Sequence, residues 1–282
     1  MYINTHAPSN MEREICDYFN VSTSDLTILL CEAGISARSD LSFDGVKFDA
    51  VIDDFINSHE AKEVIDSLLF FHLTRRLNTA KDDYQGRNLA DLLLTRNALS
   101  DFLREREIVF EQGKGHLNLF HKKSLVSLED IDESGVPYLR SRLGYAKDCK
   151  DFAFNGFLFK DRLYKNHYAR VLSEAPEFID ELTKFLGRAD IKSDYYKNSK
   201  YYCFEYCLPL SKVLFDTNGK MTLVQKRRYL LNKILYRLYE YTMVDEERVS
   251  DDNNLALRLR DDDAMNAEYF IASEIITDKM IW

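Results

Sequence analysis

Apolar residues recur at helical spacing over the first 66 residues of the chain. The predicted helices there cover residues 11–19, 26–33 and 48–69. Ser9 and Ser24 are the expected N-caps of the first two helices, and Gly34 is expected to end the second. We therefore expect residues 1–66 to form a helical N-terminal extension.

From residue 67 onwards, shorter apolar and alternating segments replace this pattern. The predicted strands cover residues 68–73, 108–111, 116–121, 136–143, 152–159, 201–210, 255–260 and 267–272. The predicted helices cover residues 89–106, 177–186 and 222–241. The turn Gly113-Lys114-Gly115 joins two of the strands as a hairpin. This order predicts the α+β class, with a split sheet and flanking helices in a domain of residues 67–282.

Composition and charge narrow the class of protein. The chain has 282 residues, of which 45% are hydrophobic and 30% charged, as expected of a globular protein with a sizeable core. Its formal net charge of −9 means that the overall field does not steer it to DNA or to anionic membranes. No apolar run reaches the roughly 20 residues that a membrane span needs.

The cysteines indicate a reducing compartment. There are five, an odd number without the spacing of a disulfide framework: Cys16, Cys31, Cys149, Cys203 and Cys207. The first residues show no apolar stretch behind a basic one, so no signal peptide is predicted. We expect a cytoplasmic protein without metal ligands or a membrane partner.

Two residues carry the candidate chemistry. His72 lies inside the apolar run Phe70-Phe71-His72-Leu73-Thr74, and Glu268 opens the last predicted strand after an acidic turn. Each also has an ordinary interpretation, His72 as a core histidine and Glu268 as the first exposed residue of a strand. A buried histidine early and a strand glutamate late in a domain are together the pair most indicative of a function.

Three short segments resemble the ADP-ribosyltransferase fold, especially the DarT-like toxins. His72-Leu73-Thr74 is similar to the His-x-Thr of its first strand. Residues 89–110 are similar to the helix and strand that follow, and residues 266–271 to the closing strand that begins with the catalytic glutamate. The resemblance covers residues 67–282 in outline and leaves residues 1–66 outside.

The resemblance implies NAD⁺ as the substrate and needs no metal. Glu268 would stabilise the positive charge that grows on the ribose as nicotinamide leaves. His72 would donate to the ribose side of the dinucleotide, with Thr74 beside it. In a strand over residues 136–143, alternation would place Tyr138, Arg140 and Arg142 on one face, beside the pyrophosphate. Arg142 joins Glu268 as a catalytic candidate, whereas Tyr138 and Arg140 join the cofactor-binding group.

The implied reaction is transfer of ADP-ribose from NAD⁺ to a macromolecule, either a nucleic acid or a protein. The enzymes that the chain resembles act as bacterial toxins or phage-defence effectors. The resemblance therefore implies a neutralising antitoxin as a partner.

Three alternatives stay open. Glu205, between Cys203 and Cys207 on one strand face, is a rival for the essential acid. Arg162 and His167 have the Arg-x4-His spacing that resembles HEPN ribonucleases, in which both residues lie on one helix. A non-enzymatic interaction protein, whose late acidic region binds a basic partner, is the third.

Overall fold

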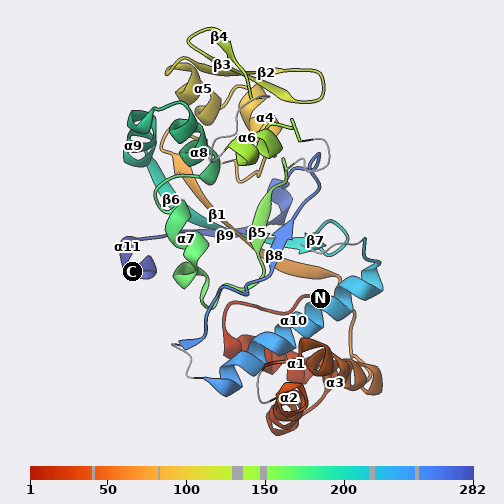
Figure 1. Cartoon of the computed structure of the whole chain (residues 1–282). Coiled ribbons are helices and arrows are strands. Elements are labelled where there is room, and N and C mark those ends of the chain that lie inside the picture. Colours follow the sequence, from red (N-terminus) through yellow and green to blue (C-terminus); the bar gives the residue numbers. More distant parts are fainter. Residues whose placement is uncertain (40–41, 82, 129–135, 147–150, 216–219, 245–247) are drawn as a thin grey trace. The chain divides into compact units, whose positions relative to one another are not determined.

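The structure is a computed structural model, and it describes the chain except for residues 40–41, 82, 129–135, 147–150, 216–219 and 245–247. The chain forms two compact units, each built from three separate segments. Unit 1 consists of Met1–Phe71, Phe157–Asn166 and Cys207–Leu257 (Figure 1). Unit 2 consists of His72–Gly156, His167–Tyr206 and Arg258–Trp282. The division predicted between residues 1–66 and 67–282 stays a prediction.

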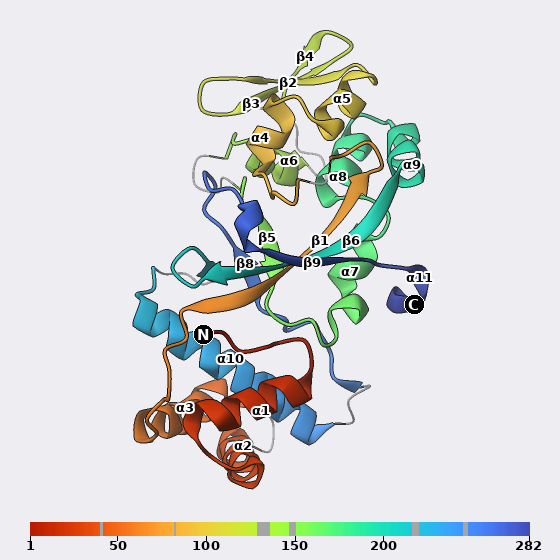
Figure 2. The same ribbon diagram turned by 180° about the vertical axis from the view of Figure 1, so that it is seen from behind.

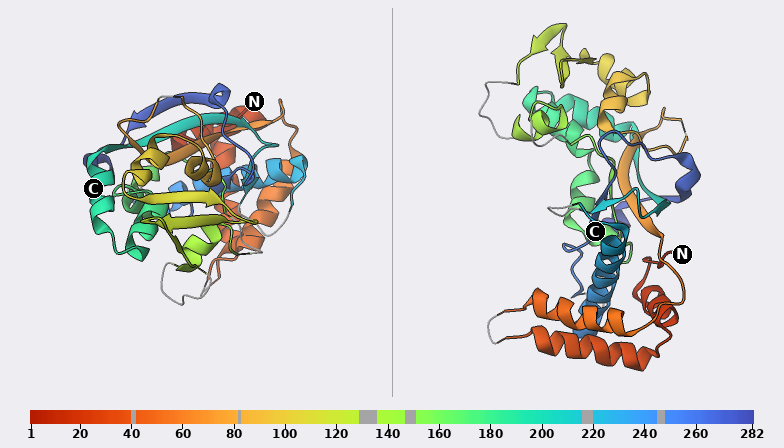
Figure 3. Two further views of the ribbon diagram at one scale, coloured as in Figure 1. Left: turned by 90° about the horizontal axis from the view of Figure 1, so that it is seen from above. Right: turned by 90° about the vertical axis from the view of Figure 1, so that its right-hand side faces the viewer.

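Unit 1 contains a bundle of helices. Its members are α1 (Pro8–Phe19), α2 (Thr23–Ala37), α3 (Gly45–Ser58) and α10 (Leu223–Met243). Helices α2 and α3 run side by side, and α10 packs against α1, α2 and α3 (Figure 3). Their buried apolar side chains, which form the core of the bundle, include Met11, Ile15, Leu26, Leu30, Phe48, Ile52, Ile234 and Leu235.

The first two helices start at neither of the residues that we predicted as N-caps. Ser22 caps α2, because its side chain accepts from the backbone N–H of Asp25 while the Asp25 carboxylate accepts from the N–H of Ser22. The N-cap predicted at Ser24 is therefore wrong by two residues. Helix α1 begins at Pro8 without a side-chain cap, so the predicted Ser9 cap is also wrong.

Gly34 lies inside α2 and does not end it. The helix continues to Ala37. A Cβ atom built at Gly34 would lie only 2.3 Å from Cε2 of Tyr239, on α10. The glycine is therefore required by the close approach of two helices and not by a change of backbone direction.

Replacing Gly34 by alanine is expected to lower the free energy of unfolding by about 1–3 kcal/mol, although alanine is the better helix former. The buried ring of Tyr239, which stacks on Phe43, must move to admit the methyl group. Urea denaturation measures the change. Gly45→Ala in α3 is the control, because nothing lies within 4 Å of its added Cβ atom. A Gly34→Ala protein more stable than the wild type would contradict this packing.

The larger sheet has the strand order β7-β8-β5-β1-β6-β9. Its strands are β1 (Ser67–Leu77), β5 (Asn155–Phe157), β6 (Ser199–Pro209), β7 (Leu214–Phe215), β8 (Ala256–Arg258) and β9 (Phe270–Ile275). Strand β6 pairs antiparallel with β9, and Phe71 of β1 faces Phe157 of β5, also antiparallel. A separate sheet contains β2 (Ile108–Gln112), β3 (Leu117–His121) and β4 (Ser124–Val126). The mixed α+β class with a split sheet and the hairpin of β2 and β3 are confirmed.

The remaining helices belong to unit 2. They are α4 (Leu89–Leu94), α5 (Ala98–Arg104), α6 (Val136–Arg142), α7 (His167–Leu172), α8 (Glu177–Phe185), α9 (Ala189–Lys197) and α11 (Asp278–Ile281). Helices α4 and α5 both contact β2 (Figure 2). The single helix predicted over residues 89–106 is broken, because the Asn97 side chain accepts from the N–H groups of Leu99 and Ser100 and starts a second helix.

Two more predicted elements have different bounds. The helix predicted over residues 48–69 ends at Ser58, and the last residues of the predicted range belong to β1, which begins at Ser67. The strand predicted over residues 267–272 begins only at Phe270. Glu268 therefore lies in η3 (Ala267–Tyr269), a single 3₁₀ turn before the strand.

Candidate functional site

Strand β1 presents a row of polar side chains on one face within unit 2. Alternate residues of a strand share a face, so His72, Thr74 and Arg76 lie together. Arg75 belongs to the other face, where its guanidinium donates to the carbonyl oxygens of Ser173 and Ser199 at 2.5 and 2.8 Å. The His72–Thr74 part of this row was predicted, whereas Arg76 was missed, although it continues the same period of two.

His72 is held as a neutral ring. Its Nδ1 lies 2.7 Å from the carbonyl oxygen of Asn155, and because a carbonyl can only accept, Nδ1 carries the proton. The ring stacks on Phe154 with centroids 4.0 Å apart. Burial lowers the pKa of His72 to about 4, although the hydrogen bond to the Asn155 carbonyl acts in the opposite direction and raises it. Near neutral pH, Nε2 is therefore a hydrogen-bond acceptor, whereas we had expected a donor.

An aromatic cluster connects His72 to the start of β9. Phe154, under the His72 ring, meets Tyr206 of β6 edge-on at 6.1 Å, and Tyr206 meets Phe270 at 5.9 Å. Tyr84 stacks on Phe270 at 4.1 Å and accepts through its carbonyl from the Tyr206 hydroxyl at 3.2 Å. The structure thus brings the two predicted segments into one cluster, with η3 directly before Phe270.

Glu268 itself is exposed. Its Oε1 accepts from the Asn266 side-chain amide at 3.2 Å. The 3₁₀ turn, and not strand alternation, sets the direction of this carboxylate. The sequence of residues 266–271 does not distinguish a strand that begins at residue 267 from a 3₁₀ turn followed by a strand, because the same apolar segment follows Glu268 in both cases.

The predicted strand carrying Tyr138, Arg140 and Arg142 is wrong, since these residues form α6. In a helix, residues four apart share a face, and the Arg142 guanidinium lies 6.0 Å from the Tyr138 ring. Arg140 is not on that face and donates to the carbonyl of Leu128 at 2.9 Å. The structure does not form the basic face that we predicted.

The charge of Arg142 is also compensated. Its guanidinium lies 2.8 Å from the Asp151 carboxylate, and its side chain is 14% exposed. Burial raises the pKa of Tyr138 and that of its hydrogen-bonding partner Glu177, and in both cases the charge of Arg142 opposes the shift. The cluster of Tyr138, Arg142, Asp151 and Glu177 holds α6 to its surroundings and is less suited to a pyrophosphate than we expected.

A pocket of about 320 Å³ lies where the polar face of β1 ends. It is lined by Arg76, Leu77, Asn78, Ala80, Lys200 and Tyr202. Arg76 lies over the ring of Phe204 at 5.4 Å and pairs with Asp83 at 3.3 Å. The pocket offers the basic side chains of Lys200, exposed at its rim, and of Arg76, which also pairs with Asp83, together with the ring of Tyr202. This combination suits a phosphate group beside a base.

Glu205 lies on the opposite face of β6 from this site. Phe204 and Tyr206 face the cluster, so alternation places Glu205 with Tyr201, whose hydroxyl donates to Ala169 of α7 at 3.0 Å. Its side chain is buried, beside Cys203 on the same face. Of the two candidate acids, Glu268 therefore lies close to the aromatic cluster on the His72 side, whereas Glu205 lies on the other side of the sheet.

Arg162 and His167 do not share a helix. Arg162 precedes the 3₁₀ turn η1 (Leu163–Lys165), and His167 begins α7. Between them Asn166 is extended, with φ −63° and ψ 144°. The helical arrangement on which the HEPN resemblance depends is therefore absent from this segment.

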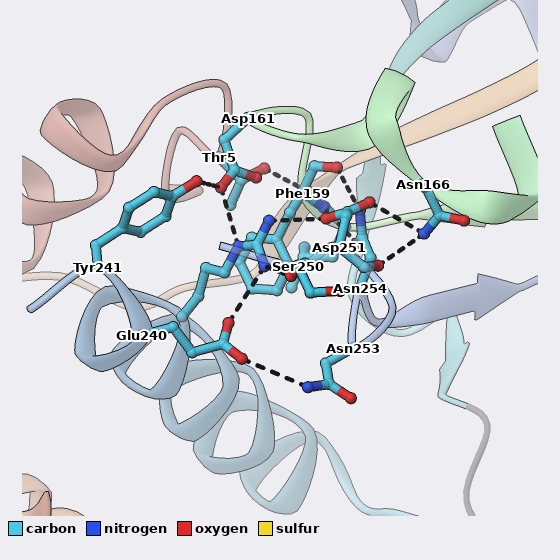
Figure 4. A network of polar contacts seen from close by, with 12 residues as sticks. Thr5, Phe159, Asp161, Asn166, Glu240, Tyr241, Ser250, Asp251, Asn253 and Asn254 are labelled. Carbon is cyan, nitrogen blue, oxygen red and sulfur yellow. Dashed lines mark hydrogen bonds and ion pairs between the residues drawn. The ribbon is translucent and has the colours of Figure 1, made fainter. Parts of the chain in front are cut away.

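Sequence reasoning missed a buried ion cluster inside unit 1, around Arg237 of α10 (Figure 4). The Arg237 guanidinium lies 2.9 Å from Asp161 and 2.7 Å from Asp251, and the three side chains are at most 2% exposed. Asn166 and Asn254 donate to the Asp251 carboxylate, and Tyr241 donates to Asp161. Because the cluster is closed to solvent, we assign it to holding α10 in place and not to catalysis.

Comparison of the chain with protein-family models, with curated proteins and with solved structures gives no match. Among the described residues, no helix combines the length and apolar character needed to cross a bilayer. The described His, Cys, Asp and Glu side chains form no group of three that could hold a metal ion. Cys16, Cys31, Cys203 and Cys207 form no disulfide within the described part of the chain, and Cys149 lies outside it.

Proposed function

We propose that the protein transfers ADP-ribose from NAD⁺ to a macromolecular acceptor. The observation that carries the proposal is the polar face of β1, where a neutral His72 shares a face with Thr74 and Arg76 and is linked through aromatic rings to the segment of Glu268. One histidine, one carboxylate and a phosphate-binding cation are sufficient for this chemistry, because nicotinamide is already a good leaving group on the ribose.

The local geometry supports one role for each of these residues. His72 accepts a hydrogen bond from a ribose hydroxyl at Nε2, and Arg76 with Lys200 binds phosphate at the pocket. The C–N bond between ribose C1′ and nicotinamide breaks with its electron pair leaving on nicotinamide, and the exposed carboxylate of Glu268 stabilises the positive ribose. A nucleophile of the acceptor then forms the new bond to C1′ and loses its proton.

A toxin or phage-defence role, with a neutralising antitoxin as partner, is part of the same proposal. It rests on the resemblance of the His72 and Glu268 segments to DarT-like enzymes. The ribonuclease alternative has no comparable support, because Arg162 and His167 lie in different elements.

Replacing His72 by alanine is expected to weaken NAD⁺ binding by about tenfold or more, since the hydrogen bond proposed between Nε2 and a ribose hydroxyl is lost. Because the pKa of His72 is about 4, the wild-type affinity is expected to stay constant from pH 5.5 to pH 8. Calorimetric titration with NAD⁺ at several pH values measures both effects.

His121→Ala is the control, because it removes a histidine of unit 2 that lies on β3, in the other sheet. Its affinity for NAD⁺ should equal that of the wild type. Equal binding by the His72→Ala protein would remove His72 from the site, and an affinity that follows a group titrating near pH 6.5 would contradict the neutral ring.

A further inference from the structure

The first helices of the protein are acidic. Residues 1–58 contain ten acidic and only three basic side chains, a net charge of −7. Residues 244–282, with eleven acidic and four basic side chains, are equally acidic, so the chain carries its negative charge at both ends. Helices α2 and α3 contain a single basic residue between them, Lys47.

Helix α2 carries two large apolar side chains on its outer side, in addition to those on its inner side. Its inner side chains, among them Leu26, Leu29 and Leu30, are buried in the bundle. Ile28 and Ile35 point outward and are 56% and 73% exposed. With a seven-residue spacing they lie two turns apart, about 10 Å along the axis, and the exposed Cys31 lies between them. Two exposed isoleucines on one stripe form a small apolar patch, and an apolar patch with a polar rim is typical of a site for a partner.

Acidic side chains lie beside this outer stripe. Asp25 and Glu32 of α2 are both exposed and fall on the same side of the stripe at helical spacing. We define the α2 face as Asp25, Ile28, Cys31, Glu32 and Ile35. It combines two exposed isoleucines with two carboxylates and includes no cation.

We propose that the α2 face binds an amphipathic helix of a partner protein that carries lysine or arginine beside an apolar stripe. Charge complementarity selects this occupant. A second copy of the chain would place carboxylates against carboxylates, and an anionic bilayer would repel the same charges. The matching helix needs apolar residues at positions i, i+3 or i+4 and i+7, the spacing with which helices pack into such a stripe.

The proposal is independent of the NAD⁺ reaction and can be tested with synthetic peptides. The probe is a fluorescent 18-residue amphipathic helix of leucine and lysine, compared with a leucine and glutamate helix of the same pattern. Fluorescence anisotropy measures binding to the full chain. We expect the leucine–lysine peptide to bind and the leucine–glutamate peptide not to bind. The double variant Ile28→Ser/Ile35→Ser should lose at least about tenfold in affinity, and Glu32→Lys should weaken binding as well.

Leu125→Ser is the matched control, because Leu125 of β4 is 61% exposed and lies outside the α2 face. Alkylation of Cys31, followed by mass spectrometry, gives a local readout that should slow when the peptide binds, with buried Cys16 as the reference. Equal affinity for the double variant, unchanged Cys31 alkylation, or no binding of the leucine–lysine peptide would overturn the proposal. Self-association that disappears in the double variant would identify a second copy as the occupant instead.

Discussion

Replacing Arg237 by methionine is expected to lower the free energy of unfolding by about 3–5 kcal/mol. Methionine retains most of the volume of the side chain but leaves Asp161 and Asp251 buried without their cation. Removing one partner of a buried ion cluster destabilises the fold by far more than the intact cluster stabilises it, because the remaining charge is buried without a counter-ion. Chemical denaturation monitored by circular dichroism measures the change.

Arg228→Met is the matched control on the same helix. Its guanidinium pairs with Asp53 at 2.5 Å, but the two side chains are 39% and 35% exposed. Water screens this pair, so its loss should cost no more than about 1 kcal/mol. Similar losses for the two variants would mean that burial of the Arg237 cluster does not matter for stability.

The pH dependence of the Arg237→Met protein gives a second readout. Burial raises the pKa of Asp251 from 3.8 to about 6, although the amide of Asn254 and the charge of Arg237 lower it. A carboxyl group whose folded pKa is raised stabilises the fold at low pH, and this contribution is lost as the pH rises through the folded pKa. Without Arg237 that pKa rises further. The stability difference between wild type and variant should therefore be smallest near pH 4 and largest near pH 7.

Replacing Glu268 by glutamine is expected to reduce the rate of nicotinamide release at least about 100-fold while NAD⁺ still binds. The amide keeps the shape of the side chain but removes the charge that stabilises the ribose as the glycosidic bond breaks. Because Glu268 is exposed in a single turn, the substitution should not change the free energy of unfolding. Release is measured by chromatography, and stability by thermal unfolding.

Glu205→Gln separates the two candidate acids. Glu205 is buried on the other face of β6, so its replacement should change stability while turnover stays close to that of the wild type. The opposite pattern, with turnover lost in Glu205→Gln and retained in Glu268→Gln, would transfer the role of essential acid to Glu205.

The sequence was sufficient where local signals agreed. Helix α10 has Thr222 and Gln225 as a capping box followed by a continuous apolar side, and both are visible in the chain. Helix α6 shows the opposite case. The alternation of Tyr138, Arg140 and Arg142 suggested a strand, yet the buried Val136, Leu139 and Leu143 have the spacing of a helix. Packing of these apolar residues decided the structure.

The site could be predicted only in part, because its contacts are distant in sequence. His72 was identified from its place in an apolar run, but the Asn155 carbonyl that fixes its tautomer is 83 residues away. Arg237 and Asp161 are separated by 76 residues, so no local pattern reveals their pairing. Tertiary packing brings these distant residues together, and the local periodicity of the sequence carries no information about which distant residues meet.

The most direct test of the proposed reaction follows both halves of NAD⁺ in one experiment. The purified chain is incubated with bacterial lysate as the source of acceptors and with NAD⁺ labelled either on nicotinamide or on adenosine. We expect free nicotinamide and macromolecule-bound ADP-ribose to appear in equal amounts, and neither to form with Glu268→Gln. If neither label moves, and NAD⁺ does not bind to the wild-type chain, the polar face of β1 is not an ADP-ribosyltransferase site.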